Sequence, residues 1–211
     1  MPSILIVDDH AVVRRGLQEI LSEELGPVDF GSAQNGAEAL EQAARQFWDL
    51  IVLDISMPDR NGIDLIKDLR RLHHKVPVLV LSMYPESQYA IRAIKAGAMG
   101  YVTKQSAAKE LVKAVATVLD GRKYISTALT HKLILDLQQS ASTTAPHESL
   151  SDREYQVLCE VGSRRSVREI AGNMGLSTKT VSTYRLRVGE KIGLKSNADF
   201  ARYCLEHGLA E

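Results

Sequence analysis

Short apolar runs that alternate with helical patterns are the feature that most constrains how this chain can fold. Five runs occur in the first part of the chain, at residues 4–7, 28–33, 50–53, 78–81 and 100–102. Three of them consist only of Ile, Leu and Val, as expected for strands buried on both faces of a sheet. Five strands that alternate with five helices predict an α/β domain with a parallel, doubly wound sheet covered by helices on both sides.

The helices are predicted from apolar residues spaced three and four positions apart. This spacing gathers apolar side chains on one face of a helix. A similar pattern over residues 126–139 predicts a further helix that leads into a polar segment. The residues that carry these patterns are Val13, Leu17, Ile20, Leu21, Ile63, Ile66, Leu69, Ile91, Ile94, Leu111, Val115, Val118, Leu119, Leu129, Leu133 and Leu137.

A polar segment at residues 138–149 divides the chain. It contains a proline and no hydrophobic periodicity, so it is typical of a linker. We therefore expect three parts. These are an α/β domain over residues 1–123, a linker helix and flexible linker over 124–149, and a smaller domain over 150–211.

The smaller domain is predicted to be all-α, with four helices. Two S-x-x-E capping boxes each indicate a helix start, and glycines indicate where those helices end. Two short helices joined by a tight turn are typical of a helix-turn-helix, which we place at Val167 to Leu186. The predicted boundaries are Ser151 to Gly162, Ser166 to Gly175, a start at Ser177, and Asn197 to Gly208.

Composition excludes several classes of protein. The chain has 211 residues, 26 basic and 26 acidic side chains, and 45% hydrophobic residues, which does not suit a disordered polyelectrolyte. No apolar run approaches the ~20 residues that span a bilayer, and the start lacks the features of a signal peptide. Cys159 and Cys204 are too few for a disulfide framework and are expected to be reduced core residues. We therefore expect a soluble, cytoplasmic protein with no membrane partner.

Polar side chains follow four of the predicted strands. Asp8 and Asp9 come after the first run and Asp54 after the third, while Ser82 and Lys104 follow the fourth and fifth. In a sheet of order 2-1-3-4-5 the first and third strands are neighbours, and ligands bind beyond their carboxyl ends. Crowded carboxylates repel unless a hard cation such as Mg²⁺ joins them, and an Asp beside that cation and a Lys can attack a phosphoryl group. The alternative is that these Asp residues only cap helices and form turns.

These residues resemble the receiver domain of bacterial two-component response regulators. The resemblance includes Ile55-Ser56-Met57-Pro58 after Asp54 and Gly100-Tyr101-Val102-Thr103 before Lys104, and it covers residues 3–120 in order and spacing. It implies a flavodoxin-like sheet. The roles that it implies are Asp54 as phosphoacceptor, Asp8, Asp9, Asp54 and the backbone carbonyl of Ser56 around Mg²⁺, Ser82 and Tyr101 as a switch pair, and Lys104 on the phosphoryl oxygens. Gln105 stands where many relatives have Pro, which can alter that loop.

The second part of the chain carries an excess of positive charge. Residues 164–195 contain eight basic and two acidic side chains, an excess of six positive charges. On the third helix of this part, Val181, Tyr184, Val188 and Ile192 are expected to face the core. The opposite face suits a recognition helix in the major groove of DNA, although a dimerisation helix or a solvated charged face is the alternative. The residues expected to contact DNA are Lys179, Ser182, Thr183, Arg185, Leu186 and Arg187.

Four segments resemble the LuxR-type helix-turn-helix domain. They begin at Leu150-Ser151, Glu169-Ile170-Ala171, Leu176-Ser177 and Glu190-Lys191. With a receiver in front, the whole chain resembles response regulators of the NarL/FixJ class, and residues 177–185 resemble the GacA/UvrY branch. Ser182 and Tyr184 stand where many relatives have Lys and His, so the base contacts of the family cannot be copied onto these positions.

The resemblance implies a transcription regulator switched by phosphorylation, and no enzyme beyond assistance in its own phosphorylation and dephosphorylation. The implied partners are a sensor histidine kinase, double-stranded promoter DNA and, after phosphorylation, a second copy of the chain. An aspartyl-phosphate phosphatase is an alternative, but such enzymes usually need a carboxylate two residues after the nucleophile, where this chain has Ser56. A DNA-binding or interaction protein independent of phosphorylation is disfavoured by the complete acceptor set.

Overall fold

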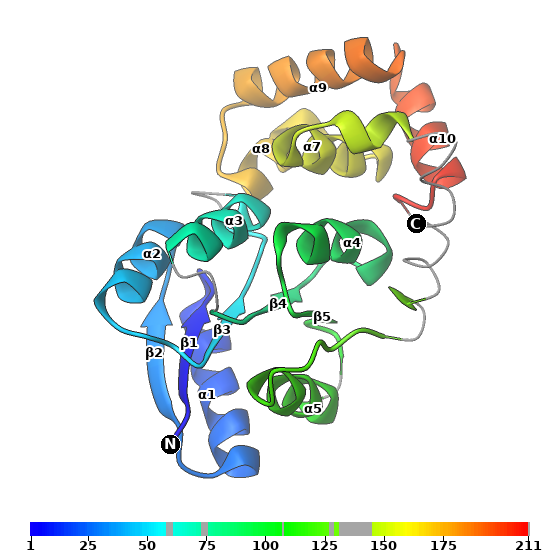
Figure 1. The fold of residues 1–211 in the computed structure, drawn as a ribbon. Coiled ribbons are helices and arrows are strands. Elements are labelled where there is room, and N and C mark those ends of the chain that lie inside the picture. Colours follow the sequence, from blue (N-terminus) through cyan, green and yellow to red (C-terminus); the bar gives the residue numbers. More distant parts are fainter. Residues whose placement is uncertain (58–60, 73–75, 107, 127–128, 131–144, 211) are drawn as a thin grey trace. The chain divides into compact units, whose positions relative to one another are not determined.

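The computed structural model describes residues 1–57, 61–72, 76–106, 108–126, 129–130 and 145–210. The chain divides into two compact units, Met1–Ser126 and Thr127–Glu211. Within the described residues, the first unit contains a sheet with helices and the second is helical (Figure 1). Most of the helix predicted over residues 126–139 lies outside the described residues, as does the polar segment up to residue 144.

The first unit is built on a parallel five-stranded sheet of order β2-β1-β3-β4-β5, which confirms the predicted doubly wound topology. Val7 lies opposite Leu53 where β1 and β3 end. The residues that follow these two strands therefore leave the sheet side by side. The strands are β1 (Ser3–Val7), β2 (Asp29–Ala33), β3 (Leu50–Leu53), β4 (Val78–Ser82) and β5 (Gly100–Thr103). Strand β2 begins one residue later than predicted.

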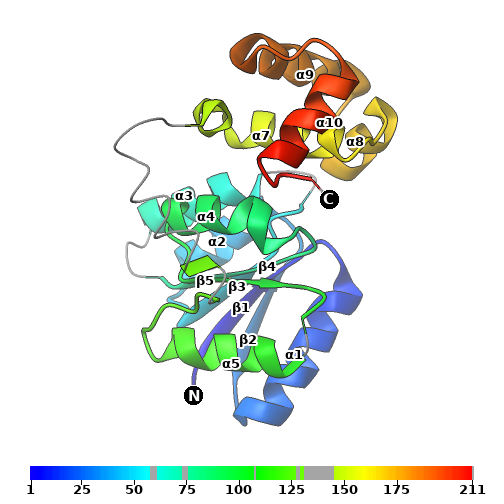
Figure 2. The same cartoon turned by 90° about the vertical axis from the view of Figure 1, so that its right-hand side faces the viewer.

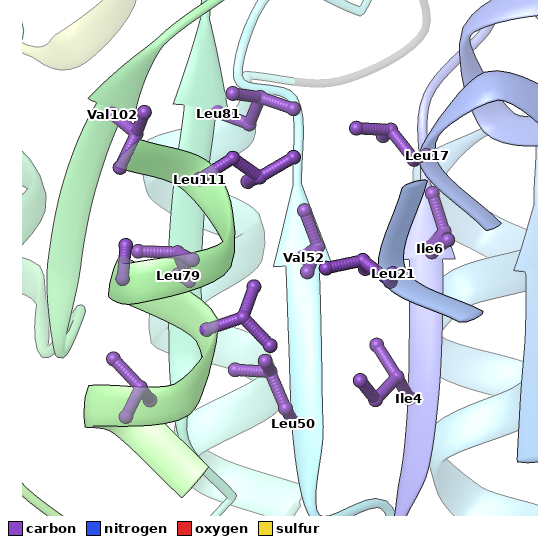
Figure 3. Packing of buried hydrophobic residues seen from close by; sticks show 13 residues of the cluster. Ile4, Ile6, Leu17, Leu21, Leu50, Val52, Leu79, Leu81, Val102 and Leu111 are labelled. Carbon is purple, nitrogen blue, oxygen red and sulfur yellow. The ribbon is translucent and has the colours of Figure 1, made fainter. Parts of the chain in front are cut away.

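Helices cover both faces of this sheet (Figure 2). On one face, Leu17 and Leu21 of α1 and Leu111 of α5 pack against Ile6 and Val52 of the central strands (Figure 3). Burial of each such side chain contributes about 1.5–3 kcal/mol, so this apolar layer holds the strand ends in place. The helices are α1 (Ala11–Leu25) and α5 (Ala108–Leu119) on that face, and α2 (Gly36–Arg45), α3 (Gly62–Leu72) and α4 (Glu86–Ala96) on the other.

Helix α4 buries a different face from the one that its isoleucines mark. Ile91 and Ile94 are only half-buried, whereas Tyr89, Ala90 and Ala93 are buried. The sequence pattern gives weight to large apolar side chains, but α4 packs mainly through small ones. Periodicity therefore predicted the helix correctly and not the side that faces the sheet.

The second unit contains the four predicted α-helices. Ser151 and Ser166 form the two predicted capping boxes, and Ser196 forms a third with Asp199, which the S-x-x-E pattern does not include. Cys159 and Cys204 are free and buried, as predicted. The helices are α7 (Asp152–Gly162), α8 (Val167–Met174), α9 (Thr178–Ile192) and α10 (Asn197–Glu206), the last ending two residues earlier than expected.

A short 3-10 helix, η1 (Pro146–Ser149), lies where the composition predicted the end of the linker. The backbone N–H of His147 donates to the hydroxyl of Tyr203 at 3.3 Å, and its ring Nδ1 lies 3.0 Å from the same oxygen. The ring of His147 also packs edge-on against the ring of His207. A polar segment therefore becomes ordered here because its partners lie 56 residues or more away in α10 and just beyond it.

Candidate functional site

An acidic pocket lies where β1 and β3 end. Asp8 and Asp54 are the first residues after these strands, and the N–H of Asp54 donates to the carbonyl of Val7 at 2.9 Å. The N–H of Asp8 donates in the same way to Ala33, which ends β2. The sheet register therefore brings together two carboxylates that are 46 residues apart in the chain.

Lys104 joins the two carboxylates. Its Nζ lies 2.6 Å from Oδ2 of Asp8 and 2.6 Å from Oδ2 of Asp54. Asp8 is 2% exposed and Asp54 is 3% exposed, so water screens these charges little. Burial raises the pKa of Asp54, although Lys104 and the Ser56 N–H, which donates to Oδ1 of Asp54 at 2.8 Å, oppose the increase. Burial acts to lower the pKa of Lys104, but the two carboxylates outweigh it and raise that pKa.

Asp9 is in a second group with His10, a residue that the sequence analysis did not select. His10 Nδ1 lies 2.9 Å from Oδ1 of Asp9 and 3.3 Å from Oδ1 of Asp8. One ligand atom from each of these three residues lies within 4.8 Å of the other two. Asp8 therefore belongs to both groups, and the sequence signal for His10 was its position directly after the two aspartates.

The donors around this pocket fit a hard divalent cation. Asp8, Asp9 and Asp54 supply three carboxylates, against one ammonium from Lys104. When all four groups are ionised, the set retains two negative charges. Carboxylate oxygens are the ligands that Mg²⁺ prefers, so both the chemistry and the charge of the pocket suit that ion.

Ser82 and Tyr101 are connected through the backbone of Tyr84. Ser82 is fully buried, its Oγ lies 3.3 Å from Oγ of Ser56, and it accepts a hydrogen bond from the N–H of Tyr84 at 3.2 Å. The hydroxyl of Tyr101 donates to the carbonyl of Tyr84 at 2.9 Å. Burial of the Tyr101 ring raises the pKa of its phenol. The loop after β4 therefore connects the acidic pocket to a buried tyrosine on β5.

The second candidate site is the outward face of α9. Val181 and Val188 are buried and Tyr184 and Ile192 are half-buried, in agreement with the predicted core face. The other face projects into solvent, and Leu186 is 63% exposed although it is apolar. The exposed residues on that side are Lys179, Ser182, Thr183, Leu186 and Arg187.

The two hydroxyls on this face and one of its arginines already have partners. Oγ of Ser182 donates to the carbonyl of Thr178, and Oγ1 of Thr183 donates to that of Lys179, each at 2.9 Å. Arg185 is half-exposed. Its Nη2 donates to Oδ1 of Asn197 at 2.8 Å, and its guanidinium lies over the ring of Phe200 at 5.5 Å from the centroid. Helix α10 therefore holds Arg185, whereas Arg187 extends into solvent.

Comparison with known families gives a match for each unit. Residues 4–116 match the response regulator receiver domain. Residues 148–204 match the bacterial regulatory proteins of the luxR family. The chain belongs to the response regulator family. It is a two-component transcription regulator with a DNA-binding, LuxR-type helix-turn-helix, in agreement with the resemblance drawn from its motifs.

This response regulator has relatives that match along nearly their whole length. It is 33% identical over 211 residues to the response regulator GacA of Pseudomonas viridiflava. That match covers 100% of this chain and 99% of GacA. It is 31% identical over 209 residues to the response regulator UvrY of Escherichia coli strain K12, covering 99% and 96% of the two chains. These matches support the predicted resemblance to the GacA/UvrY branch.

Solved structures with the same fold include DNA complexes. RcsB from Salmonella enterica serovar Typhimurium, bound to promoter rprA in the presence of phosphomimetic BeF3-, matches with a TM-score of 0.63 and 25% identity. That match covers 96% of this chain and 97% of RcsB. A structure of two RcsB dimers bound to two parallel DNAs matches with a TM-score of 0.58 and 25% identity, covering 97% and 98% of the chains.

None of the helices in the described part of the response regulator is long and apolar enough to cross a bilayer.

Proposed function

We propose that Asp54 accepts a phosphoryl group from a partner sensor histidine kinase and that this phosphorylation regulates DNA binding. The observation that carries the proposal is the contact that Lys104 makes with both Asp8 and Asp54 in a buried pocket. Residues 1–123 then form the regulatory domain, residues 150–211 the DNA-binding domain, and residues 124–149 the connection. The protein acts in the cytoplasm, where its kinase partner and promoter DNA are both accessible.

In the phosphorylation step, a carboxylate oxygen of Asp54 attacks the phosphorus of a phosphohistidine. The new O–P bond forms as the N–P bond of the donor breaks. Lys104 exchanges its contact with Asp54 for one with a phosphoryl oxygen and neutralises charge there. Asp8, Asp9, Asp54 and the backbone carbonyl of Ser56 would hold Mg²⁺, and the bound ion would supply further positive charge to offset the negative charge of the transferred group.

Phosphorylation changes the loop after β4. The phosphoryl group adds a charge of about −1.5 to −2, which attracts the ammonium of Lys104 and the hydroxyl of Ser82. Because Tyr84 binds both Ser82 and Tyr101, movement of Ser82 is transmitted to the β4–β5 side of the sheet. We propose that this surface change favours a homodimer. Its two α9 helices then bind half-sites about one DNA turn apart.

The outward face of α9 reads the DNA. Lys179, Arg185 and Arg187 bind phosphates, with Arg185 held in place by Asn197. Ser182, Thr183 and Leu186 meet base edges in the major groove, where each base pair presents its own pattern of donors, acceptors and methyl groups. This division gives phosphate contacts the main share of affinity and the short side chains the main share of specificity.

An aspartyl-phosphate phosphatase is the other function considered. Ser56 stands where such an enzyme usually has its acid–base carboxylate, and its hydroxyl lies 3.3 Å from that of Ser82. A phosphatase also gives the LuxR-type domain no role. Both points favour the regulator.

Labelling with acetyl phosphate and Mg²⁺ tests the proposal. The wild type is expected to incorporate one phosphoryl group per chain and to release it slowly, without repeated turnover. Asp54→Asn is expected to abolish incorporation. Asp64→Asn, an exposed carboxylate on α3 that pairs with Lys67, is the matched control and should label normally. Full labelling of the Asp54→Asn variant would overturn the assignment, and rapid multiple turnover by the wild type would favour the phosphatase.

Sedimentation of the labelled protein tests the coupling to dimer formation. Phosphorylated wild type is expected to associate more strongly and to bind promoter DNA more tightly than the unmodified protein. Asp54→Asn treated in the same way should behave as the unmodified protein. Equal association and equal DNA affinity of the labelled and unlabelled wild type would contradict the coupling.

A further inference from the structure

Three arginines lie between the end of α7 and the first turn of α8, and one of them has a buried acidic partner. Arg165 Nη1 donates to both carboxylate oxygens of Glu160, at 2.7 and 2.8 Å. Glu160 is 2% exposed and also accepts a hydrogen bond from Nδ2 of Asn173 at 3.4 Å. Glu160 of α7 therefore contacts both Arg165 and the end of α8, and it balances the charge of Arg165.

The other two arginines lie in a different environment. Arg164 and Arg168 are exposed and form no ion pair with any residue that the structure describes. The acid next to Arg168 is Glu169, whose Oε2 accepts hydrogen bonds from the backbone N–H and the hydroxyl of Ser166. Two cations at the start of α8 are therefore exposed and have no acidic partner among the described residues.

Arg164 also has an unusual backbone conformation. Its φ is +60°, and it is the one non-glycine residue with positive φ among the residues described. An L side chain is strained in this region, whereas glycine adopts it freely. Glycine would therefore make the same turn with less strain and without the cation. Residues in such conformations are found preferentially where a side chain serves a function.

Arg164 and Arg168 lie just before and within the first turn of the helix-turn-helix. They lie at the start of α8, the first helix of the helix-turn-helix, and α9 is the second. In such motifs the second helix enters the major groove while the first crosses the sugar–phosphate backbone. We infer that Arg164 and Arg168 bind DNA phosphates beside the groove that α9 enters, and that Arg165 does not because Glu160 holds it. This inference rests on DNA binding by the second unit and not on phosphorylation of Asp54.

Salt-dependent binding of the full-length protein to a mixed-sequence DNA duplex tests this inference. Arg164→Asn removes the cation and keeps a residue that tolerates positive φ. This variant and Arg168→Gln are each expected to bind several-fold more weakly. Each should reduce the slope of log affinity against log salt by about 0.9, the effect of one lost phosphate contact. Arg164→Lys keeps the charge and is expected to retain the wild-type slope.

Two controls separate DNA contact from folding. Arg165→Gln is expected to melt at a lower temperature, because Glu160 loses its partner, and to keep the wild-type salt slope. Arg164→Gly is expected to melt at or above the wild-type temperature although it loses a phosphate contact. A structural role alone would not separate stability from salt dependence in this way.

Wild-type slopes in Arg164→Asn and Arg168→Gln would overturn the inference. An equal loss of slope in a folded Arg165→Gln variant would overturn it as well. If the wild type itself failed to bind the duplex at low salt, the proposed DNA binding would fail together with this inference. A failure of the inference alone is therefore distinguishable from a failure of the function.

Discussion

Nζ of Lys104 lies 2.6 Å from a carboxylate oxygen of Asp54 although the two residues are 50 positions apart. The same nitrogen lies 2.6 Å from a carboxylate oxygen of Asp8. Removal of one partner from a buried ion pair leaves the other charge uncompensated. We therefore expect Lys104→Met to lower the free energy of unfolding of the receiver by about 3 kcal/mol. Urea titrations measure this change.

The same variant has a second expected property. Since the ammonium is lost, Mg²⁺ should stabilise Lys104→Met more than it stabilises the wild type. Lys113→Met, which removes an exposed lysine of α5, is the matched control and should leave the unfolding midpoint unchanged. Equal stability of Lys104→Met and the wild type would show that the contact with Asp8 and Asp54 contributes nothing.

Tyr101 is expected to remain protonated well above the ordinary tyrosine range. Burial raises the pKa of its phenol, so the folded protein retains that proton as the pH rises. The protonated, buried phenol therefore contributes to the stability of the fold below the ordinary tyrosine pKa. This contribution is lost as the pH rises through the raised pKa of the folded state. Tyr101→Phe should therefore leave the tyrosinate absorbance unchanged up to about pH 11, one unit above the ordinary value. A loss of amplitude near pH 10 would mean that this phenol is not buried in solution.

Glu154 contributes stability to the DNA-binding unit that is expected to be lost at acid pH. Burial alone would raise the pKa of this carboxyl, but the hydrogen bonds from Lys191 and Ser151 outweigh burial and lower the pKa below its ordinary 4.5. A carboxyl with a lowered pKa stabilises the fold above its ordinary pKa, and this contribution is lost as the pH falls through the folded-state pKa. Melting curves of Glu154→Gln between neutral pH and about pH 3 should show a smaller decrease than those of the wild type. Parallel curves for the two proteins would contradict this role.

Thr183 and Arg187 are expected to affect DNA binding in different ways. Thr183→Ala should cost about 1 kcal/mol at one base position and leave the salt slope unchanged. Arg187→Ala should weaken binding to all sequences and reduce the slope by about 0.9. Titrations of cognate and scrambled duplexes over a range of salt concentrations measure both effects. If Arg187→Ala relaxed specificity at a single guanine with an unaltered slope, Arg187 would be a base-reading residue.

Local sequence alone was sufficient to predict the helices and strands and the positions of the acidic residues at the strand ends. Apolar runs, capping boxes and glycine ends act over a few residues, so periodicity was sufficient for the strands of the sheet and for α7, α8 and α9. The topological rule for doubly wound sheets then placed Asp8 and Asp54 together, because it depends only on strand order. The motifs around them were also sufficient to indicate the family.

Only the tertiary structure decided which side chains have partners. Periodicity could not show that Arg165 is held by Glu160 while Arg164 projects into solvent, because adjacent arginines look equivalent in a charge count. It could not show that Asn197 holds Arg185, or that His147 contacts Tyr203, because these partners are 12 and 56 residues apart. It selected Ile91 and Ile94 on α4, whereas close packing buried Ala90 and Ala93. Each of these outcomes depends on distances between separate elements, and these distances are set only when the helices and strands pack together.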